Sequence, residues 1–407
     1  MPMLTRAPDG TLRLPALATA HSHAFQRALR GRAQRPTAGV PAADDFWTWR
    51  GAMYELAGSL TPESIHAISL VAFRELARAG VRTVGEFHYV HHQPDGTPYD
   101  DRTVLADAVV LAARQAKLRI ALLRVAYHRA GPGRAPEEGQ RRFCDPTVDD
   151  VLRDVDTLRA RHAGDPDVIV GLAPHSVRAV PPAWLAPLSE YAARCKMPLH
   201  MHVAEQVREV DECVAETGRR PVELLADRGL LSERFVAVHA TNLAPHEAEL
   251  LGGAKAFACI CPTTERDLGD GLGDLAALAS AGVRLCTGVD SYVLVDPIED
   301  LRALETHERL RTRARLTRVS DVTGAWQARG SPTPAPTPAP TPAEQLWRAG
   351  SIEGAAACGF GEGELAAGGH VVIREDHPSL ELVPPELLLD AIVFGSGCAI
   401  VDRVEPA

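Results

Sequence analysis

Short apolar runs alternate with longer segments of helical periodicity through most of the chain. The runs are rich in Val, Ile, Leu and Ala, and they are short enough to be buried strands of a parallel sheet. They lie at Arg13–Ala20, Val81–Val90, Leu118–Ala126, Val168–Pro174, Met197–Val203, Arg234–His239, Ala256–Cys261 and Val283–Val289. The pattern therefore predicts eight strands, each followed by a longer connection.

The clearest helical segment is Leu60–Gly80. Thr61 stands at the N-cap, Pro62 at the first helical position and Gly80 just past the end, as helix termini prefer. Further helical segments are predicted at Val104–Lys117, Val148–His162, Pro182–Cys195, Pro221–Arg228 and Pro245–Leu251. Repeated strand–helix units favour a parallel α/β sheet, and eight of them favour a closed (β/α)8 TIM barrel. An open doubly wound sheet is the alternative, but no glycine-rich phosphate turn follows the first run.

Two regions fall outside this alternation. Ser331–Gln345 is a Pro/Ala/Thr repeat, which predicts an extended, exposed loop. After Gly350, the stretches HVVIRED, LLLDAIVF and CAIVDRV predict short strands and a helix. We therefore divide the chain into residues 1–14 (a residual N-terminal segment of a β appendage), 15–325 (the barrel), 326–348 (the loop) and 349–407 (a C-terminal helix and β-rich appendage).

Composition narrows the class of protein. The 407 residues are 45% hydrophobic, which is enough for a large core, and the net charge is −10. No stripe of Lys or Arg is present, which argues against a nucleic-acid partner. The eight cysteines are scattered without CxxC spacing, as in reduced proteins. No apolar run reaches the length of a signal-peptide core or a membrane helix, so we expect a soluble, cytoplasmic protein with no membrane partner.

Candidate metal ligands stand at the ends of four predicted strands, where a barrel carries its active site. His21 and His23 end the first run and share a face because strand side chains alternate. The fifth run ends with His200 and His202, of which His202 is nearer the mouth and His200 deeper in the barrel. His239 ends the sixth run, and Asp290 follows the eighth.

Each of these residues alone has an ordinary structural explanation, such as a hydrogen-bonded core histidine or a helix-capping aspartate. Taken together they predict one divalent metal held by His21, His23, His202 and Asp290, with one position left for water. Imidazole and carboxylate ligands favour Zn²⁺ and also suit Fe²⁺.

These motifs resemble those of the amidohydrolase superfamily, in its mononuclear deaminase branch. The lysine that bridges two metals in dinuclear members is missing from GLAPHSVR at the fourth strand, so the resemblance implies one metal. Within the superfamily, the chain is similar to the formimidoylglutamate deiminases over residues 15 to 320. The similarity lies in HSHAFQRALRG, DDFWTWRGAMY, VGEFHYVHH, GLAPHSVRAV, HVAEQ and CPTTERDLGDG.

The resemblance implies a linear amidine with two carboxylates, N-formimino-L-glutamate, as the substrate. Arg50 and Arg178 follow segments expected at the barrel mouth, and their guanidinium groups suit carboxylates. By resemblance, Gln26, Tyr89 and His175 complete the pocket. We assign Trp47 and Trp49 to packing, and His91 and His92 to a solvated loop.

The expected reaction releases ammonia and N-formyl-L-glutamate in histidine degradation. A bound metal would lower the pKa of its water toward about 7. Asp290 takes the proton from that water, His239 orients the water and stabilises developing charge, and Glu205 protonates the imino nitrogen.

Two alternatives stay open. One is a deaminase of guanine or an adenosine-type substrate, which would keep the metal ligands but need a pocket for a ring. The other is a non-catalytic relative, because the chain departs from the family in its short N-terminal segment, in the Pro/Ala/Thr repeat and in GVDSY where GSDS followed by His or Asn is usual. The resemblance also implies a homodimer and a small, incomplete β-sandwich formed by the chain termini.

Overall fold

Eight parallel strands form a barrel in the computed structural model, which describes residues 3–34, 46–315 and 340–407. Neighbours in the barrel follow the order of the chain. The strands are β3 (Leu17–Ser22), β4 (Val81–His88), β5 (Arg119–Ala126), β6 (Val168–Pro174), β7 (Leu199–Val203), β8 (Phe235–His239), β9 (Phe257–Ile260) and β10 (Arg284–Thr287). A parallel bridge between Ser22 and Asp290 joins the last strand to the first. The predicted (β/α)8 barrel is confirmed.

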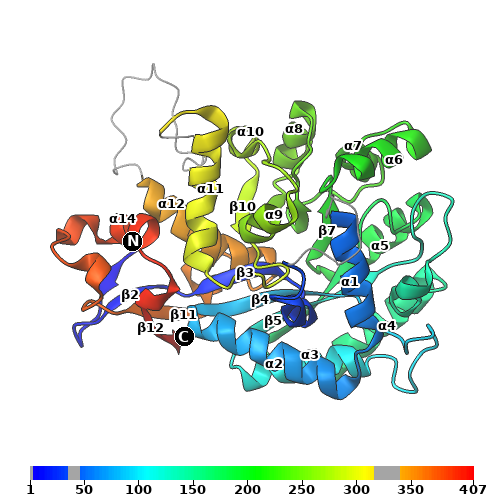
Figure 1. Ribbon diagram of the computed structural model, residues 1–407, viewed down its shortest axis with the longest axis horizontal. Coiled ribbons are helices and arrows are strands. Elements are labelled where there is room, and N and C mark those ends of the chain that lie inside the picture. Colours follow the sequence, from blue (N-terminus) through cyan, green and yellow to red (C-terminus); the bar gives the residue numbers. More distant parts are fainter. Residues whose placement is uncertain (1–2, 35–45, 316–339) are drawn as a thin grey trace.

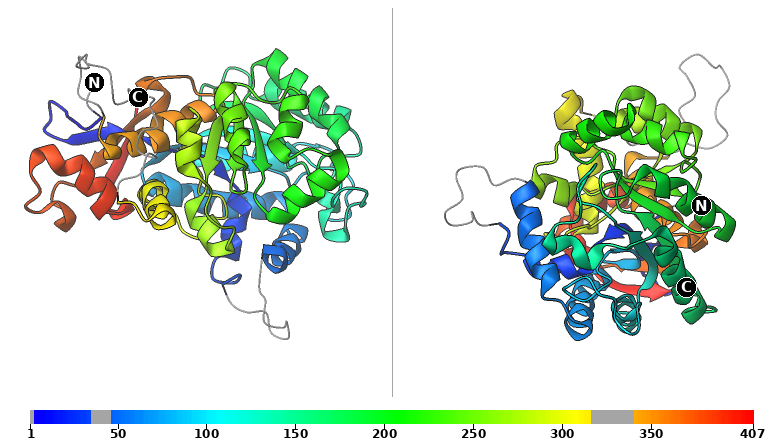
Figure 2. Two further views of the ribbon diagram at one scale, coloured as in Figure 1. Left: turned by 90° about the horizontal axis from the view of Figure 1, so that it is seen from above. Right: turned by 90° about the vertical axis from the view of Figure 1, so that its right-hand side faces the viewer.

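Helices surround these strands, as the views along and across the barrel show (Figure 1, Figure 2). All six helical segments predicted from the sequence are present. The α-helices of the barrel are α1 (Phe46–Gly58), α2 (Pro62–Arg78), α3 (Val104–Gln115), α4 (Val148–Arg161), α5 (Pro182–Cys195), α6 (Val207–Thr217), α7 (Pro221–Asp227), α8 (Pro245–Gly253), α9 (Pro262–Leu268), α10 (Leu275–Ser280) and α11 (Pro297–Thr312). None of the described helices is both long enough and apolar enough to cross a membrane.

Helix α2 shows how the sequence specifies one of these elements. The Thr61 side chain accepts a hydrogen bond from the backbone N–H of Ser64 at 3.2 Å, which satisfies a donor that the first helical turn leaves free. Ile65, Ala72 and Leu76 are buried on the face that packs against the barrel. The predicted cap and apolar face are therefore confirmed.

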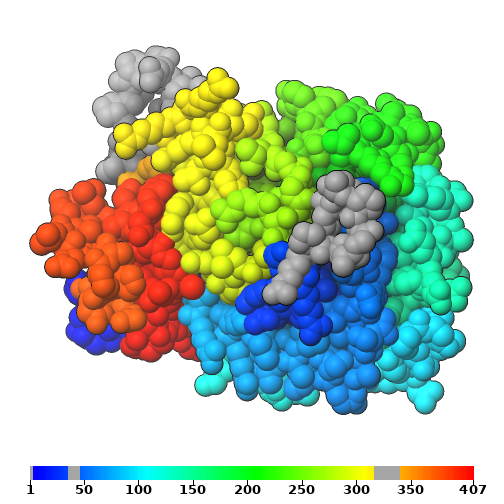
Figure 3. Space-filling view, viewed as in Figure 1, coloured from blue at the N-terminus to red at the C-terminus, as the bar shows by residue number. Residues whose placement is uncertain are grey.

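The two ends of the described chain form a separate four-stranded antiparallel sheet. Its order is β1 (Thr5–Arg6), β2 (Leu12–Pro15), β11 (Gly369–Ile373) and β12 (Val401–Pro406). In the space-filling view, the N-terminal strands in blue and the C-terminal segments in orange and red form a lobe beside the barrel (Figure 3). The described termini thus make one separate antiparallel sheet, as expected for a small, incomplete β-sandwich formed by the chain termini.

The first predicted strand, Arg13–Ala20, spans parts of two strands. Strand β2 ends at Pro15 in the small sheet, and β3 begins at Leu17 in the barrel. Between them, the backbone N–H of Ala16 donates to the carbonyl of Gly369 at 3.0 Å. Burial explains the division, because β2 alternates between buried and half-buried residues whereas β3 is buried throughout.

The C-terminal segments behave as predicted, with one difference. The stretches HVVIRED, LLLDAIVF and CAIVDRV contain β11, helix α14 (Leu388–Gly395) and β12. Within the range predicted to be a loop, however, Pro342–Arg348 forms helix α12, whose Thr341 cap accepts a hydrogen bond from the backbone N–H of Glu344. The Pro/Ala/Thr repeat before Pro340 lies outside the described residues.

Candidate metal centre and substrate pocket

Four side chains converge at the C-terminal ends of β3, β7 and β10. The Nε2 atom of His21 lies 3.1 Å from Nε2 of His23 and 3.2 Å from Nε2 of His202. Oδ1 of Asp290 lies 3.5 Å and 3.4 Å from Nε2 of His21 and His23. Ligands bonded at about 2.0–2.1 Å in a tetrahedral site stand about 3.4 Å apart. The ligand atoms of His21, His23 and Asp290 form one group within 4.8 Å of one another, and those of His21, His202 and His239 form another, so the site can hold a divalent metal.

The backbone holds Asp290 against the two histidines of β3. The N–H of Asp290 donates to the carbonyl of His21 at 3.1 Å, and the N–H of His23 donates to the carbonyl of Asp290 at 3.0 Å. Gly288 permits this approach, because a Cβ atom there would lie 2.8 Å from Cβ of His21 and 2.9 Å from Sγ of Cys261. Only glycine can therefore stand at position 288 without displacing a metal-ligating strand.

The histidine rings are turned so that their Nε2 atoms face the centre. Nδ1 of His23 donates to the carbonyl of Phe87 at 3.0 Å, and Nδ1 of His202 donates to the carbonyl of His175 at 3.1 Å. Such hydrogen bonds fix the ring orientation of metal ligands. Burial lowers the pKa of His21 to about 3 and also lowers the pKa values of His23 and His202. The three rings are therefore neutral, as metal binding requires.

His239 stands beside this centre and contacts three carboxylates. Its Nε2 lies 3.6 Å from Oδ2 of Asp290 and 3.7 Å from Oε1 of Glu205, and its Nδ1 donates to Oε1 of Glu265 at 3.2 Å. Although burial opposes it, Glu205, Glu265 and Asp290 together raise the pKa of His239 well above its usual value. Sequence reasoning missed Glu265, although it lies within the motif CPTTERDLGDG.

Glu205 lies on the same side of the centre as His239, just after β7. Burial is the main reason that the pKa of its carboxyl is raised to about 8, although His239 lowers it. The neighbouring carboxylates of Asp270 and Asp290 raise the pKa of Glu205 further. A carboxyl in this environment carries a proton near neutral pH and can donate it.

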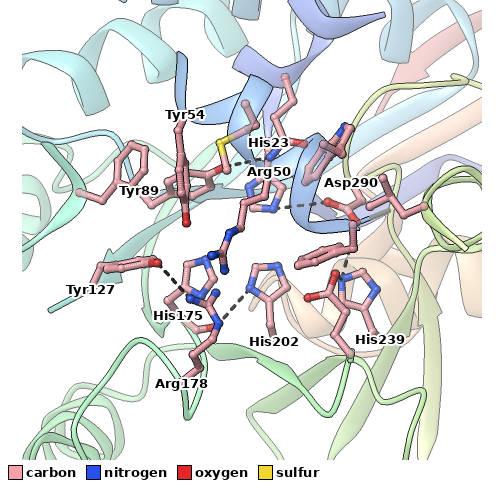
Figure 4. Close-up of a pocket in the computed structure, with 17 residues that line it drawn as sticks. His23, Arg50, Tyr54, Tyr89, Tyr127, His175, Arg178, His202, His239 and Asp290 are labelled. Atoms are coloured by element: carbon pink, nitrogen blue, oxygen red, sulfur yellow. Dashed lines mark hydrogen bonds and ion pairs between the residues drawn. The ribbon is translucent and has the colours of Figure 1, made fainter. Parts of the chain in front are cut away.

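A pocket opens directly over the candidate metal centre. Its lining includes all five residues predicted to bind substrate, together with His23, His202, Glu205, His239 and Asp290. Figure 4 shows Arg50 and Arg178 reaching into this space from opposite sides, with His175 between them and the metal centre beyond. His21, although it contacts the other ligands, lies behind them and does not line the pocket. The predicted site residues are thus brought together.

The two arginines carry no acidic partner among the described residues. Nη1 of Arg50 is buried and makes no hydrogen bond there. Nη1 of Arg178 donates to the hydroxyl of Tyr127 and the carbonyl of Ala130, both at 3.3 Å. Burial lowers the pKa of Arg50, and the charge of Arg178 lowers it further. Two partly desolvated guanidinium groups without counter-ions make this end of the pocket a receptor for anions.

Aromatic side chains form the wall around the arginines. Those that sequence reasoning did not identify are Phe46, Tyr54, Tyr127 and Phe143. Gln140 donates to the hydroxyls of Tyr54 at 3.0 Å and Tyr127 at 2.7 Å, which holds the two rings together. Nε2 of Gln26 donates to the hydroxyl of Tyr89 at 2.8 Å. The sequence could have indicated Tyr54 as a pocket residue, because it lies in the motif FWTWRGAMY. No motif of the sequence marks Tyr127 in this way.

Three sequence-based assignments are wrong. Trp49, assigned to packing, lines the pocket. His91 and His92, assigned to a solvated loop, are 3% and 2% exposed. Both backbone N–H groups donate to the carbonyl of Arg142, and Nε2 of His91 donates to the carbonyl of Val125, so the segment after β4 folds inward. His200 is buried away from the pocket and bonded to the carbonyl of Ala357 at 2.9 Å, as predicted.

Known proteins share this sequence and architecture. The sequence model of the amidohydrolase family matches residues 12–369. A formimidoylglutamate deiminase from Pseudomonas aeruginosa is 37% identical over 94% of this chain and 81% of its own length. A 5-methylthioadenosine/S-adenosylhomocysteine deaminase from Syntrophobacter fumaroxidans is 26% identical over 88% of this chain and 70% of its own. The crystal structure of an amidohydrolase from Brucella melitensis superimposes with a TM-score of 0.82 and 35% identity, covering 96% of this chain and 82% of that one.

Proposed function

Because the chain belongs to the amidohydrolase family, we propose that it hydrolyses N-formimino-L-glutamate to N-formyl-L-glutamate and ammonia. The substrate places a planar amidine at one end and two carboxylates at the other. The pocket has the matching division, with the candidate metal centre at one end and Arg50 and Arg178 at the other.

The observation that carries this proposal is the pair of arginines, Arg50 and Arg178, which form no ion pair in the part of the chain that the structure describes. A buried guanidinium that finds no acidic partner in the protein is stabilised only when an anionic ligand supplies one. A dicarboxylate satisfies both Arg50 and Arg178, whereas a purine ring satisfies neither. This favours the reaction named for the P. aeruginosa relative over the one named for the S. fumaroxidans relative.

We propose that His21, His23, His202 and Asp290 hold one divalent metal, and that this metal is zinc. The distances between their ligand atoms and the neutral state of the rings support the site. When bound, such a metal supplies a Lewis acid that makes water nucleophilic near neutral pH.

The surrounding residues would move the protons of the reaction. Oδ2 of Asp290 faces His239 at 3.6 Å, and together they bracket the position from which water attacks the formimino carbon. Asp290 accepts the proton of that water, and the cationic ring of His239 stabilises the negative charge that develops on oxygen. Glu205 donates its proton to the imino nitrogen, which gives a tetrahedral carbon carrying a hydroxyl and an amino group. The proton held by Asp290 then passes to that amino group, the carbon–nitrogen bond breaks and ammonia leaves. Glu205 takes up the hydroxyl proton as the carbonyl of the formyl group forms on the glutamate nitrogen.

The substrate-binding residues would orient the amidine over these groups. Arg50 and Arg178 each take one carboxylate, and the lining residues Gln26, Tyr89 and His175 contact the carbon chain and its polar groups. Fixing both ends of a flexible molecule in this way places the reacting carbon at a constant distance from the nucleophile. A homodimer and a cytoplasmic location remain predictions, and light scattering of the purified protein tests the first.

An ammonia-release assay on the purified protein tests the proposal. We expect turnover of N-formimino-L-glutamate, loss of turnover after treatment with a chelator, and recovery on adding Zn²⁺. Adenosine and guanine serve as competing substrates, and faster release of ammonia from either would replace the proposal with a purine deaminase. A chain that binds no divalent metal in elemental analysis would instead support a non-catalytic relative.

A further inference from the structure

Trp47 lies between two guanidinium groups at the mouth of the pocket. The Cζ atom of Arg50 is 4.5 Å from the centre of the Trp47 ring, and the Cζ atom of Arg208 is also 4.5 Å from it. Trp47 and Arg50 are three residues apart on α1, so they are neighbours on one side of that helix, whereas Arg208 belongs to α6. Trp47 itself does not line the pocket; it contacts the lining residues Arg50 and Phe46, and the centre of the Phe46 ring lies 5.2 Å from its own.

Arg50 is held by aromatic rings, and within residues 3–34, 46–315 and 340–407 no acidic side chain pairs with it. Besides Trp47, the ring of Tyr54 lies 5.4 Å from its Cζ atom. Aromatic faces attract a guanidinium through their quadrupole and leave its net charge in place. A carboxylate would hold the same side chain but neutralise it, and would compete with an anionic ligand. The aromatic support therefore keeps Arg50 both ordered and cationic.

Arg208, the second guanidinium beside Trp47, is anchored by an acidic side chain. Nε of Arg208 donates to Oε1 of Glu212 at 2.9 Å, and Nη2 of Arg134 donates to the same carboxylate at 2.9 Å. Arg208 thus has an acidic partner, whereas Arg50 has none among the described residues. Because Arg208 and Arg134 share the carboxylate of Glu212, it offsets part of their charge and so lessens the repulsion between Arg208 and Arg50.

We propose that Trp47 is a positioning residue that fixes the Arg50 guanidinium for a substrate carboxylate without neutralising it, and that Arg208 completes the clamp from α6. The proposal rests on the function proposed above in taking the ligand to be a dicarboxylate. It also ties α1 to α6, the helix that begins two residues after Glu205.

The test uses the metal-loaded, full-length protein and glutarate, a dicarboxylate that has no reacting amidine. Titration calorimetry measures its Kd, and steady-state kinetics measure KM and kcat for N-formimino-L-glutamate. For Trp47→Leu we expect both Kd and KM to rise about tenfold with kcat within about twofold of wild type, because loss of a partly desolvated cation–π contact weakens binding by about this factor. Trp47→Phe keeps an aromatic face and should recover most of the affinity.

Two further variants separate the clamp from general damage. Phe360→Leu removes a ring that lies 4.3 Å from the guanidinium of Arg119 outside the pocket, and it should leave Kd and KM unchanged. Arg208→Gln removes a side chain that is 49% exposed, so it should fold normally, and we expect Kd to rise about threefold. If Trp47→Leu fails to fold by circular dichroism, this variant and Trp47→Phe decide the question.

The outcomes are distinct. An unchanged Kd in Trp47→Leu or in Arg208→Gln overturns the clamp and leaves the proposed function standing, as does a fall in kcat with constant KM. If the wild type binds glutarate but does not turn over N-formimino-L-glutamate, the proposed function fails while the Kd series still decides the clamp. If the wild type does not bind glutarate at all, the clamp is wrong.

Discussion

The two ends of the pocket are built in different ways. At the metal end, the candidate ligands stand on strands or directly after them, and backbone hydrogen bonds at 3.0 Å and 3.1 Å join Asp290 to the first strand. At the arginine end, Arg50 comes from helix α1 and Arg178 from the loop after β6, and both are supported by aromatic side chains.

The difference reflects what each end has to do. Ligands of a metal must keep their positions within a few tenths of an ångström, and barrel strands supply that rigidity. A carboxylate receptor must carry unbalanced positive charge, so it cannot be fixed by the acidic groups that usually pair with arginine. In the proposed function, the metal ligands therefore stand at the ends of barrel strands, while the two carboxylate-binding arginines stand on elements laid over the barrel mouth. We therefore expect substitutions at the metal end to change mainly kcat, and substitutions at the arginine end to change mainly KM.

The largest effect is expected at the metal end. Asp290→Asn removes both a proposed ligand and the proposed proton acceptor, so we expect kcat to fall by about 10⁴ or more and metal content to drop well below one per chain. Elemental analysis and the ammonia assay measure the two quantities. Asp376→Asn, on a side chain that is 82% exposed, is the control and should behave as wild type. An Asp290→Asn protein with full activity would remove this residue from the mechanism.

A smaller loss is expected from the proton donor. Glu205→Gln keeps the size of the side chain and loses its proton, so kcat should fall about 10³-fold while metal content and KM stay near wild type. The same assays apply, with the exposed Glu249→Gln on α8 as the control. Turnover at the wild-type rate with metal bound would exclude Glu205 as the proton donor.

The arginine end should respond in KM. Arg50→Met keeps much of the apolar stem and removes the charge, so we expect KM to rise about 10- to 100-fold, as for loss of a charge-assisted hydrogen bond, with a smaller change in kcat. Arg153→Met, on a side chain that is 59% exposed, is the matched control. If kcat falls and KM does not change, the division of labour between the two ends is wrong.

Sequence predicted the metal end well because strand periodicity alone determines its geometry. His21 and His23 must share a face at a spacing of two, and the ends of parallel strands must meet at one rim. Once the strand ends had been predicted, the positions of His202 and Asp290 at the same rim followed from them. The same logic failed at Ala16, where the chain passes from one sheet to another, because a continuous apolar run hides a change of partner strand.

Sequence predicted less of the arginine end because its contacts are long-range. Arg50 and Arg178 were identified by their motifs, but Trp49 was misassigned and Tyr127 was not found. Their roles depend on how α1 and the segment after β5 fold over the barrel mouth, and no local periodicity reports that. The assignment of His91 and His92 was wrong for a similar reason. Polar residues that follow a strand are usually exposed, but here both are buried and both backbone N–H groups donate to the carbonyl of Arg142.

The smallest effect tests the rigidity of the metal end alone. Gly288→Ala would place a methyl group 2.8 Å from Cβ of His21 and 2.9 Å from Sγ of Cys261. Relief of that overlap requires β3 and the Asp290 segment to separate, which should cost about 1–3 kcal/mol of stability and lower metal affinity about tenfold. Thermal denaturation of the metal-free protein measures the change in stability. A competition titration with a chromogenic chelator measures the change in metal affinity.

Gly253→Ala on α8 is the matched control, because a Cβ atom there meets nothing within 4 Å. It should leave metal affinity unchanged and the protein as stable or slightly more stable. Because Gly288 touches neither arginine, KM for N-formimino-L-glutamate in metal-saturated Gly288→Ala should also stay at the wild-type value. A rise in KM under those conditions would mean that strain at the strand ends reaches the arginines, and that the two ends of the pocket are mechanically coupled.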